Sequence, residues 1–258
     1  MDAIVTAGGI PQPGEPLYEY TRGGCKALLD VAGKPMVQWV LDALSASTEV
    51  GDIVLIGLEP DSGVTSSKKL YYLANQGSMV ENLLAGVREV LAHNPSTSHV
   101  LAVSSDIPTV KSNMVDWVIK TAMETQHDFY YNVVTRQVME TRFPNSNRSY
   151  TRLKDAELCG GDMNVIRAIT TDSHEALWNK IVDSRKNVFR QAALIGYDTL
   201  LLLLLRAITV EQAAARVSKR LNIRGRAVIC PYAEVAMDVD KPHQLEMLRA
   251  DLAKQALS

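Results

Sequence analysis

The chain has 258 residues, 47% of them hydrophobic, which supports one sizeable α/β domain or two small ones with a full core. A net charge of -2 and a pI near 6.2 give no basic field for nucleic acid, so a bound polyphosphate would need local positive groups. The three cysteines are widely spaced, which argues against a disulfide framework or a structural zinc site and fits a reduced cytoplasm. Met1-Asp2 does not resemble the basic start of a signal peptide, so we expect none.

The N-terminal stretch carries the first chemical signal. Residues Ala3 to Ala7 form a short apolar run that ends in Gly8-Gly9. This pattern predicts a buried strand followed by a loop whose backbone N–H groups can face an anion. Arg22 and Lys26 follow the loop, where a guanidinium and an ammonium could both reach a triphosphate.

Strand-like and helix-like segments then alternate along the chain. Lys34-Pro35 is predicted to open a helix, with Pro at its first position and an apolar stripe of Met36, Val37, Val40, Leu41 and Leu44. Apolar runs predict strands at 52–57, 99–103, 129–134 and 226–230, and helical spacing predicts helices at 79–91 and 112–122. This order predicts an α/β fold, with a mostly parallel sheet covered on both faces in a Rossmann-like three-layer α/β/α core.

Two strand-to-helix junctions could bind a ligand. Gly77-Ser78 precedes the helix that begins at Met79, where backbone N–H groups could turn toward a ligand or simply open the helix. Asp106 follows the strand at 99–103, at the sheet edge where open α/β folds bind ligands, although a turn aspartate would look the same.

The segment from 136 to 164 breaks the alternating pattern. It contains four arginines among turn-forming residues, and they could form a solvated excursion or a lid over an anionic substrate: Arg136, Arg142, Arg148 and Arg152. Gly160-Gly161-Asp162 follows. This turn resembles the Gly-Gly-Asn turn that lines the acceptor pocket of nucleotidyltransferases of GT-A-type fold, with Asp162 in place of the amide. The resemblance implies phosphorylated substrates nearby, beside which an added negative charge is unfavourable unless it binds a metal, a hydroxyl or a cation, and we expect Asp162 to recognise a substrate hydroxyl.

Residues 173–222 are predicted to form a helical insertion. Ser173 is expected to cap a helix at 175–187, a second helix at 194–208 contains six leucines at 200–205, and Thr209 to Gln212 form a capping box for a third. The leucine run is too short to span a membrane, and we favour a helix buried on all sides or packed in a dimer over contact with a membrane surface. The insertion could cover an acceptor pocket or form a homo-oligomer contact.

Near the C-terminus, Asp238 and Asp240 precede an amphipathic helix. They are two residues apart and therefore project to the same side of an extended segment. From the residues alone, they are an ordinary acidic flank of the helix.

Together these motifs resemble the opening signature of the nucleotidyltransferases of GT-A-type fold. The matching order is Ala7-Gly8-Gly9, a loop, Arg22-Gly23-Gly24, Lys26 to Leu29, and Gly33 to Met36. This group includes the MobA-like, molybdenum-cofactor guanylyltransferase-like NTP transferases and the sugar-1-phosphate nucleotidylyltransferases. The chain departs from the family in a longer loop with three prolines, and we take Arg22 as the loop arginine.

The resemblance implies one nucleotidyltransferase domain over 1–258, with an acceptor-side excursion at 136–164 and the helical insertion at 173–222. It implies that Ala7, Gly8, Gly9, Gly77 and Ser78 bind the nucleotide. The catalytic group would be Arg22, Lys26 and Asp106, the acceptor residues Arg148, Arg152, Gly161 and Asp162, and the metal ligands Asp106, Asp240 and Asp238.

The reaction implied is transfer of a nucleoside monophosphate from a nucleoside triphosphate to a phosphorylated sugar or cofactor-like acceptor, with release of pyrophosphate. Mg²⁺, with Mn²⁺ as an alternative, would be held by carboxylates, because both take hard oxygen ligands. Two other functions stay open from the sequence: a GT-A glycosyltransferase that uses a nucleotide sugar, and a non-catalytic nucleotide-binding module.

Overall fold

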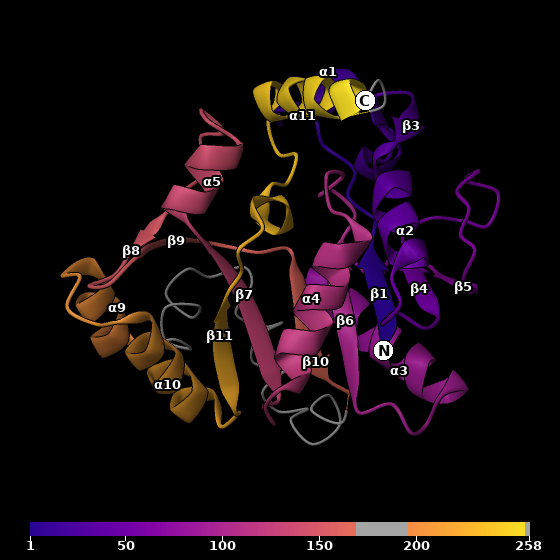
Figure 1. Ribbon diagram of the computed structural model, residues 1–258. Helices are drawn as coiled ribbons and strands as arrows, with labels where there is room; N and C mark the ends of the chain where they lie inside the picture. Colours follow the sequence, from indigo (N-terminus) through magenta and orange to yellow (C-terminus); the bar gives the residue numbers. More distant parts are fainter. Residues whose placement is uncertain (169–195, 256–258) are drawn as a thin grey trace.

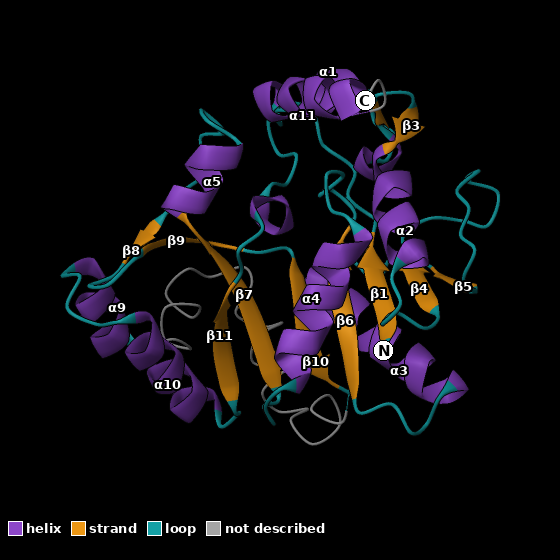
Figure 2. Cartoon of the chain, in the orientation of Figure 1, coloured by secondary structure: helices purple, strands orange, loops and turns teal. Residues whose placement is uncertain are grey.

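The computed structural model describes residues 1–168 and 196–255 (Figure 1). Its centre is a nine-stranded mixed sheet in the order β5-β4-β1-β6-β10-β7-β9-β8, with β11 also paired to β7. Helices lie on both faces of this sheet (Figure 2). The predicted α/β class with helices on both faces of the sheet is therefore confirmed. The sheet is mixed and not mostly parallel, because its described strands form four parallel and four antiparallel pairs.

Four parallel strands form one half of the sheet. They are β1 (Asp2–Thr6), β4 (Ile53–Ile56), β5 (Leu70–Leu73) and β6 (His99–Ser104). β1 is central, because it pairs in parallel with β4 on one side and with β6 on the other. The carboxyl ends of β1 and β6 thus meet at one edge, which places the loops after Thr6 and Ser104 together.

The other half of the sheet is mostly antiparallel. Its strands are β7 (Phe129–Thr135), β8 (Thr151–Arg152), β9 (Glu157–Gly160), β10 (Met163–Arg167) and β11 (Gly225–Ile229). β10 is inserted antiparallel between β6 and β7, whereas β11 runs parallel to β7. This insertion brings the turn between β9 and β10 beside the carboxyl end of β6.

Alternate residues of the parallel strands pack into two separate hydrophobic clusters, one on each face of the sheet. Ala3 and Val5 of β1 pack into a large cluster that includes residues of α2 (Met36–Ala46) and α4 (Ser112–Met123). Ile4 points to the other face, into a smaller cluster with α3 (Met79–His93). This alternation follows from the two-residue period of a strand, and it makes three layers.

The remaining helices lie at the periphery. α10 (Val210–Leu221) lies next to β11, α9 (Tyr197–Leu204) lies beside α10 and β8, and α5 (Arg136–Arg142) follows β7. α1 (Tyr18–Thr21) and α11 (Pro242–Gln255) lie together across the top of Figure 1, where the Arg249 guanidinium stacks over the Tyr20 ring. Short elements complete the fold: η1 (Lys26–Leu28), β2 (Asp30–Val31), β3 (Lys34–Pro35) and η2 (Ala233–Ala236).

Some local predictions need correction. Lys34-Pro35 does not open a helix: it pairs as β3 with Asp30-Val31, and the helix begins at Met36 because Pro35 keeps an extended ψ of 139°. The strands β5, β8, β9 and β10 and the helix α5 were not predicted. The expected helix at 175–187 lies outside the described residues.

The leucine run also differs from its prediction. The helix ends at Leu204, and Leu201, Leu204 and Leu205 are 55%, 80% and 64% exposed, so the helix is not buried on all sides. None of the helices in the described ranges combines the length and the hydropathy of a membrane span. The capping box at Thr209 and Gln212 is confirmed.

A buried aspartate ties the antiparallel half of the sheet together. Asp128, just before β7, accepts hydrogen bonds from the guanidinium of Arg224 at 2.8 and 3.2 Å and from Arg167 at 3.1 Å. The hydrogen bonds from Arg224 hold the pKa of Asp128 well below its usual range, against the opposing effect of burial. One carboxylate thus links the residues that flank β7, β10 and β11.

We expect Asp128→Asn to lower the free energy of unfolding by about 2 kcal/mol at pH 7, since it removes charge-assisted hydrogen bonds. Because the folded-state pKa is depressed, this stabilisation is fully present above the unfolded-state pKa of about 3.9 and is lost progressively as the pH falls from there toward the folded-state pKa. Urea unfolding at pH 7 and pH 2.5 measures the difference. Asp198→Asn, at an ion pair whose carboxylate side chain is 66% exposed, is the control. An equal difference at both pH values would contradict this account.

Candidate active site

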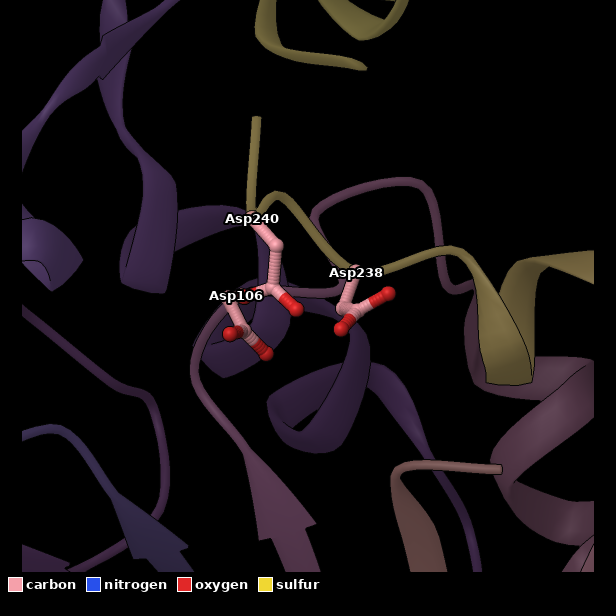
Figure 3. Close-up of side chains that lie close together, drawn as sticks. All are labelled: Asp106, Asp238 and Asp240. Atoms are coloured by element: carbon pink, nitrogen blue, oxygen red, sulfur yellow. The ribbon is translucent and has the colours of Figure 1, made fainter. Parts of the chain in front are cut away.

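Three carboxylates gather above the carboxyl edge of the sheet (Figure 3). Asp106 follows β6, and Asp238 and Asp240 come from the segment before α11, yet one oxygen from each lies within 4.8 Å of the others. Like charges at this distance repel unless a cation lies among them. Carboxylate oxygens are the ligands that Mg²⁺ takes in proteins, so these three residues could hold a divalent cation.

Lys26 reaches this cluster from the N-terminal half of the chain. Its ammonium lies 2.7 Å from Asp106 Oδ2 and 2.9 Å from Asp240 Oδ1. Although burial lowers the pKa of Lys26, the two carboxylates raise it above its usual value. The predicted convergence of Lys26, Asp106 and Asp240 is therefore present in the structure.

Backbone hydrogen bonds fix the two acidic segments against each other. The N–H of Val239, between the two C-terminal aspartates, donates to the carbonyl of Asp106 at 3.0 Å. The Ser104 hydroxyl donates to Asp106 Oδ1 at 2.6 Å and so orients that carboxylate. Gln244, buried in the first turn of α11, accepts hydrogen bonds from the N–H groups of Asp240 and Lys241, each at 2.9 Å.

The glycine loop lies beside Lys26. The N–H of Lys26 donates to the Gly9 carbonyl at 2.8 Å, and the Cys25 thiol donates to the Ala7 carbonyl at 3.0 Å. Gly8 packs against Gly57, whose φ is +96° and where an added Cβ would lie 2.3 Å from the Gly8 Cα. The loop thus has no room for side chains at these two positions, and its backbone is held next to the ammonium.

Asn75 connects the glycine loop to the second predicted nucleotide-binding turn. Its amide donates to the Gly8 carbonyl at 3.0 Å, and its side-chain oxygen accepts from the N–H of Gly77 at 3.0 Å. Ser78 is the N-cap of α3, and its hydroxyl accepts from the Glu81 N–H at 3.2 Å. The cap confirms the helix entry, and the hydrogen bonds of Asn75 place this turn against Gly8.

A second positive charge lies on the other side of the cluster. The Arg148 guanidinium forms an ion pair with Asp238, and its Nη2 is 3.9 Å from Asp162 Oδ2. The site therefore contains four carboxylates, Asp106, Asp162, Asp238 and Asp240, and two cations, Lys26 and Arg148. Among the described residues the balance is negative, which favours a further cation.

Asp162 has an unusual environment. Its Oδ2 is buried and accepts no hydrogen bond from any described residue. Burial raises the pKa of Asp162 to about 7, and the carboxylates of Asp106 and Asp240 add to this effect against Arg148 and Lys26. A strongly shifted carboxyl group among other charges is typical of a functional site.

The backbone of the β9–β10 turn also positions the cluster. The Ser104 N–H donates to the Asp162 carbonyl at 2.9 Å, and the Asp162 N–H donates to the Val235 carbonyl at 2.8 Å. The N–H of Gly161 donates to the Asn132 carbonyl at 2.8 Å. An added Cβ on Gly161 would lie 3.0 Å from that same oxygen, so the close approach favours glycine.

Not all of the predicted site residues lie together in the structure. Arg22 is exposed at the left-handed C-cap of α1 with φ 48°, and its side chain makes no contact with the cluster among the described residues. Arg152 lies on β8, where its Nε is 3.0 Å from Glu157. Of the other arginines in the excursion, Arg142 pairs with Glu234 and Asp251, and Arg136 pairs with Glu157. Only Arg148 of these four forms an ion pair with the carboxylates.

This geometry can be set beside known proteins. The family model of the MobA-like NTP transferase domain matches residues 4–222, which include the glycine loop, Lys26, Asp106 and Asp162. The chain belongs to the MobA-like NTP transferase family. Comparison with curated protein sequences gives no match.

Several solved structures have a fold similar to that of this MobA-like transferase. A hypothetical transferase from Thermus thermophilus has 32% identity and a TM-score of 0.81, over 95% of this chain and 98% of that one. CMP:2-keto-3-deoxy-manno-octonic acid synthetase complexed with CTP has 17% identity and a TM-score of 0.60, over 98% and 99%. 4-Diphosphocytidyl-2C-methyl-D-erythritol synthase from Anaerococcus prevotii has 11% identity and a TM-score of 0.60, over 97% and 95%. The last two share the fold.

Sequence reasoning missed three residues that support the site of this MobA-like transferase: Asn75, Ser104 and Gln244. Gln244 had a detectable signal, because a Gln three positions after the helix N-cap is half of a capping box. Ser104 is the last residue of β6 and Asn75 follows β5, and neither has a local sequence signal, so only their distant partners reveal their role.

We expect Asp162→Asn to stabilise the fold in a pH-dependent way. The unfolded-state pKa of an aspartate is near 3.9, so with a folded-state value of about 7 the native state loses stability as the pH rises from 4 to 7 and stays weakened above it. Asn does not ionise, and the variant should melt on the order of 4 °C above wild type at pH 8, with a smaller gain at pH 5.

Circular dichroism melts in EDTA measure this difference. Asp61→Asn, at an exposed loop carboxylate, is the matched control and should change neither melt. A gain that is the same at both pH values would show that Asp162 is not held neutral by its surroundings.

Proposed function

We propose that the chain is a Mg²⁺-dependent nucleotidyltransferase that joins the nucleoside monophosphate part of a nucleoside triphosphate to a phosphorylated acceptor. A phosphate oxygen of the acceptor forms a bond to the α-phosphorus, the bond from this phosphorus to the β-phosphate oxygen breaks, and pyrophosphate leaves with the electron pair. The observation that carries this proposal is the contact of Lys26 with both Asp106 and Asp240 beside the Gly8–Gly9 loop.

Charge is the main barrier to this reaction, because two anionic reactants must meet and more negative charge develops on the leaving group. A divalent cation, when bound by Asp106 and Asp240, would neutralise phosphate oxygens of both reactants; Mn²⁺ is the alternative ion. The backbone N–H of Lys26 donates to the Gly9 carbonyl of the glycine loop. The Lys26 ammonium is therefore positioned to exchange its carboxylate partners for phosphate oxygens. Arg22, exposed at the far end of the loop, is proposed to approach the β- and γ-phosphates.

The two ends of the site are proposed to select the two substrates. Gly77 and Ser78, which Asn75 holds against Gly8, would lie along the base or ribose. Arg148 would bind the acceptor phosphate, and Asp162 would bind an acceptor hydroxyl, which a carboxyl group of pKa about 7 can do as donor or acceptor. Gly161 fixes the turn, and Arg152 is the outermost acceptor candidate.

The fold neighbours suggest the first substrate to test. Two of them carry names of cytidylyl-transferring enzymes, and one was solved with CTP. We therefore propose CTP as the first triphosphate, with phosphorylated polyols and sugars as acceptors. A cytoplasmic location and a homo-oligomeric state remain predictions from the sequence.

The test is pyrophosphate release with the four nucleoside triphosphates, Mg²⁺ and a panel of sugar and polyol phosphates. We expect Lys26→Ala and Asp106→Ala to lower turnover by roughly 10²- to 10³-fold, as when a charge-stabilising group is lost. Lys120→Ala, at an exposed lysine on α4, is the control and should keep full turnover.

Near-normal turnover in either site variant, with wild-type circular dichroism, would defeat the assignment. Release of a nucleoside diphosphate from nucleotide sugars, with no pyrophosphate from any triphosphate, would replace it with a glycosyltransferase. Absence of Mg²⁺-dependent triphosphate binding by calorimetry would favour a non-catalytic module.

A further inference from the structure

An apolar cavity lies between the antiparallel half of the sheet and the helices α9 and α10. Its volume is about 460 Å³, within the range of pockets that hold small organic ligands. Among the described residues its walls come from β7, β9 and β11 on the sheet side and from α10 on the other, and they include Phe129, Val133, Leu158, Ala214, Val217 and Leu221. The cavity does not belong to the nucleotide half of the candidate site.

The helix α10 faces this cavity with its apolar stripe. Ala213, Ala214 and Val217 line the cavity, and the opposite side of the helix carries exposed charges such as Arg216 and Lys219. A surface helix usually buries such a stripe against the core. No residue of α10 is buried, however. Its cavity-side residues are only half-buried, so an apolar ligand in the cavity could contact them.

One end of the cavity adjoins the acceptor side of the candidate site. Tyr131 and Gly160 both line it, and a Cβ on Gly160 would lie 2.1 Å from the Tyr131 hydroxyl, so the ring crosses the strand only because this residue is glycine. Burial raises the pKa of Tyr131, and the nearby Asp162 carboxylate raises it further. Gly160 ends β9, so this end of the cavity lies at the strand that leads into the turn with Asp162.

We propose that this cavity receives an apolar group of the acceptor, whose phosphate lies at Arg148. This narrows the phosphorylated acceptors of the proposed function to phosphate monoesters with a hydrocarbon-like part, in place of fully hydroxylated sugar phosphates. This inference rests on the proposed function, because it assigns the second substrate of the same site. It also gives the helical insertion a role: α10 covers the apolar part of the acceptor.

The probes are n-alkyl phosphates from methyl to octyl, titrated by calorimetry into the full chain with Mg²⁺ present. Each methylene that enters an apolar pocket strengthens binding about fourfold, from roughly 0.8 kcal/mol per group. We expect the dissociation constant to fall steadily with chain length. Equal affinity for methyl and octyl phosphate in the wild type would overturn the proposal.

Two tryptophan variants on α10 locate the binding. Ala214→Trp fills the cavity, and we expect it to lose the chain-length dependence while keeping the affinity for methyl phosphate and CTP. Ala215→Trp places the same ring on the exposed side of the helix and should behave as wild type. Val217→Phe, a smaller change on the cavity side, replaces Ala214→Trp if that variant does not fold.

If affinity rises equally with alkyl chain length in the Ala214→Trp and Ala215→Trp variants, the cavity is not the binding site. Failure of this inference is distinct from failure of the proposed function. If the wild-type protein binds CTP with Mg²⁺ and releases pyrophosphate, but its affinity for alkyl phosphates does not depend on chain length, only the inference of an apolar acceptor is refuted. If the protein shows no Mg²⁺-dependent CTP binding, the proposed function is refuted, regardless of how it binds the alkyl phosphates.

Discussion

Repulsion among carboxylates is the constraint on which the rest of this structure depends. Asp106, Asp238 and Asp240 crowd within 4.8 Å at the carboxyl edge of the sheet, and Asp162 lies nearby without a hydrogen bond from the described residues to its Oδ2. Such a cluster is unfavourable by itself. Lys26 and Arg148 offset it in part. The remaining negative charge suits the divalent cation proposed here, and it adds to burial, the larger effect, in raising the pKa of Asp162.

The fold holds this unfavourable cluster with neutral backbone contacts. The carbonyl of Asp106 accepts from the Val239 N–H, and the Asp162 peptide bridges Ser104 and Val235. These bonds join β6, the β9–β10 turn and the segment before α11, three parts of the chain that are far apart in sequence. Because the contacts use backbone groups, side chains at the site stay free to exchange partners. Catalytic sites commonly combine such a rigid frame with charged groups held out of their preferred state.

The sequence allowed prediction of features that depend on local patterns. The strand before Gly8, the strand before Asp106 and the acidic pair before α11 each have a short signature, and parallel strands must bring their ends to one edge. Features that depend on distant pairing were not predictable. Arg136, Arg142, Arg148 and Arg152 look alike in sequence, yet only Arg148 contacts the cluster, because α5 and β8 direct the others to Glu157, Glu234 and Asp251. The exposure of Leu201 and Leu204 likewise depends on how α9 packs, which six identical residues cannot reveal.

Binding of Mn²⁺, followed by electron paramagnetic resonance with and without CTP, tests the central claim most directly. If the carboxylates and the glycine loop form one site, Mn²⁺ and CTP should each strengthen the binding of the other. Asp106→Asn and Asp240→Asn should weaken Mn²⁺ binding at least tenfold, an effect typical of losing a metal-site partner, and the exposed-loop variant Asp61→Asn should leave it unchanged. Equal Mn²⁺ affinity in all four proteins, with or without CTP, would contradict the account.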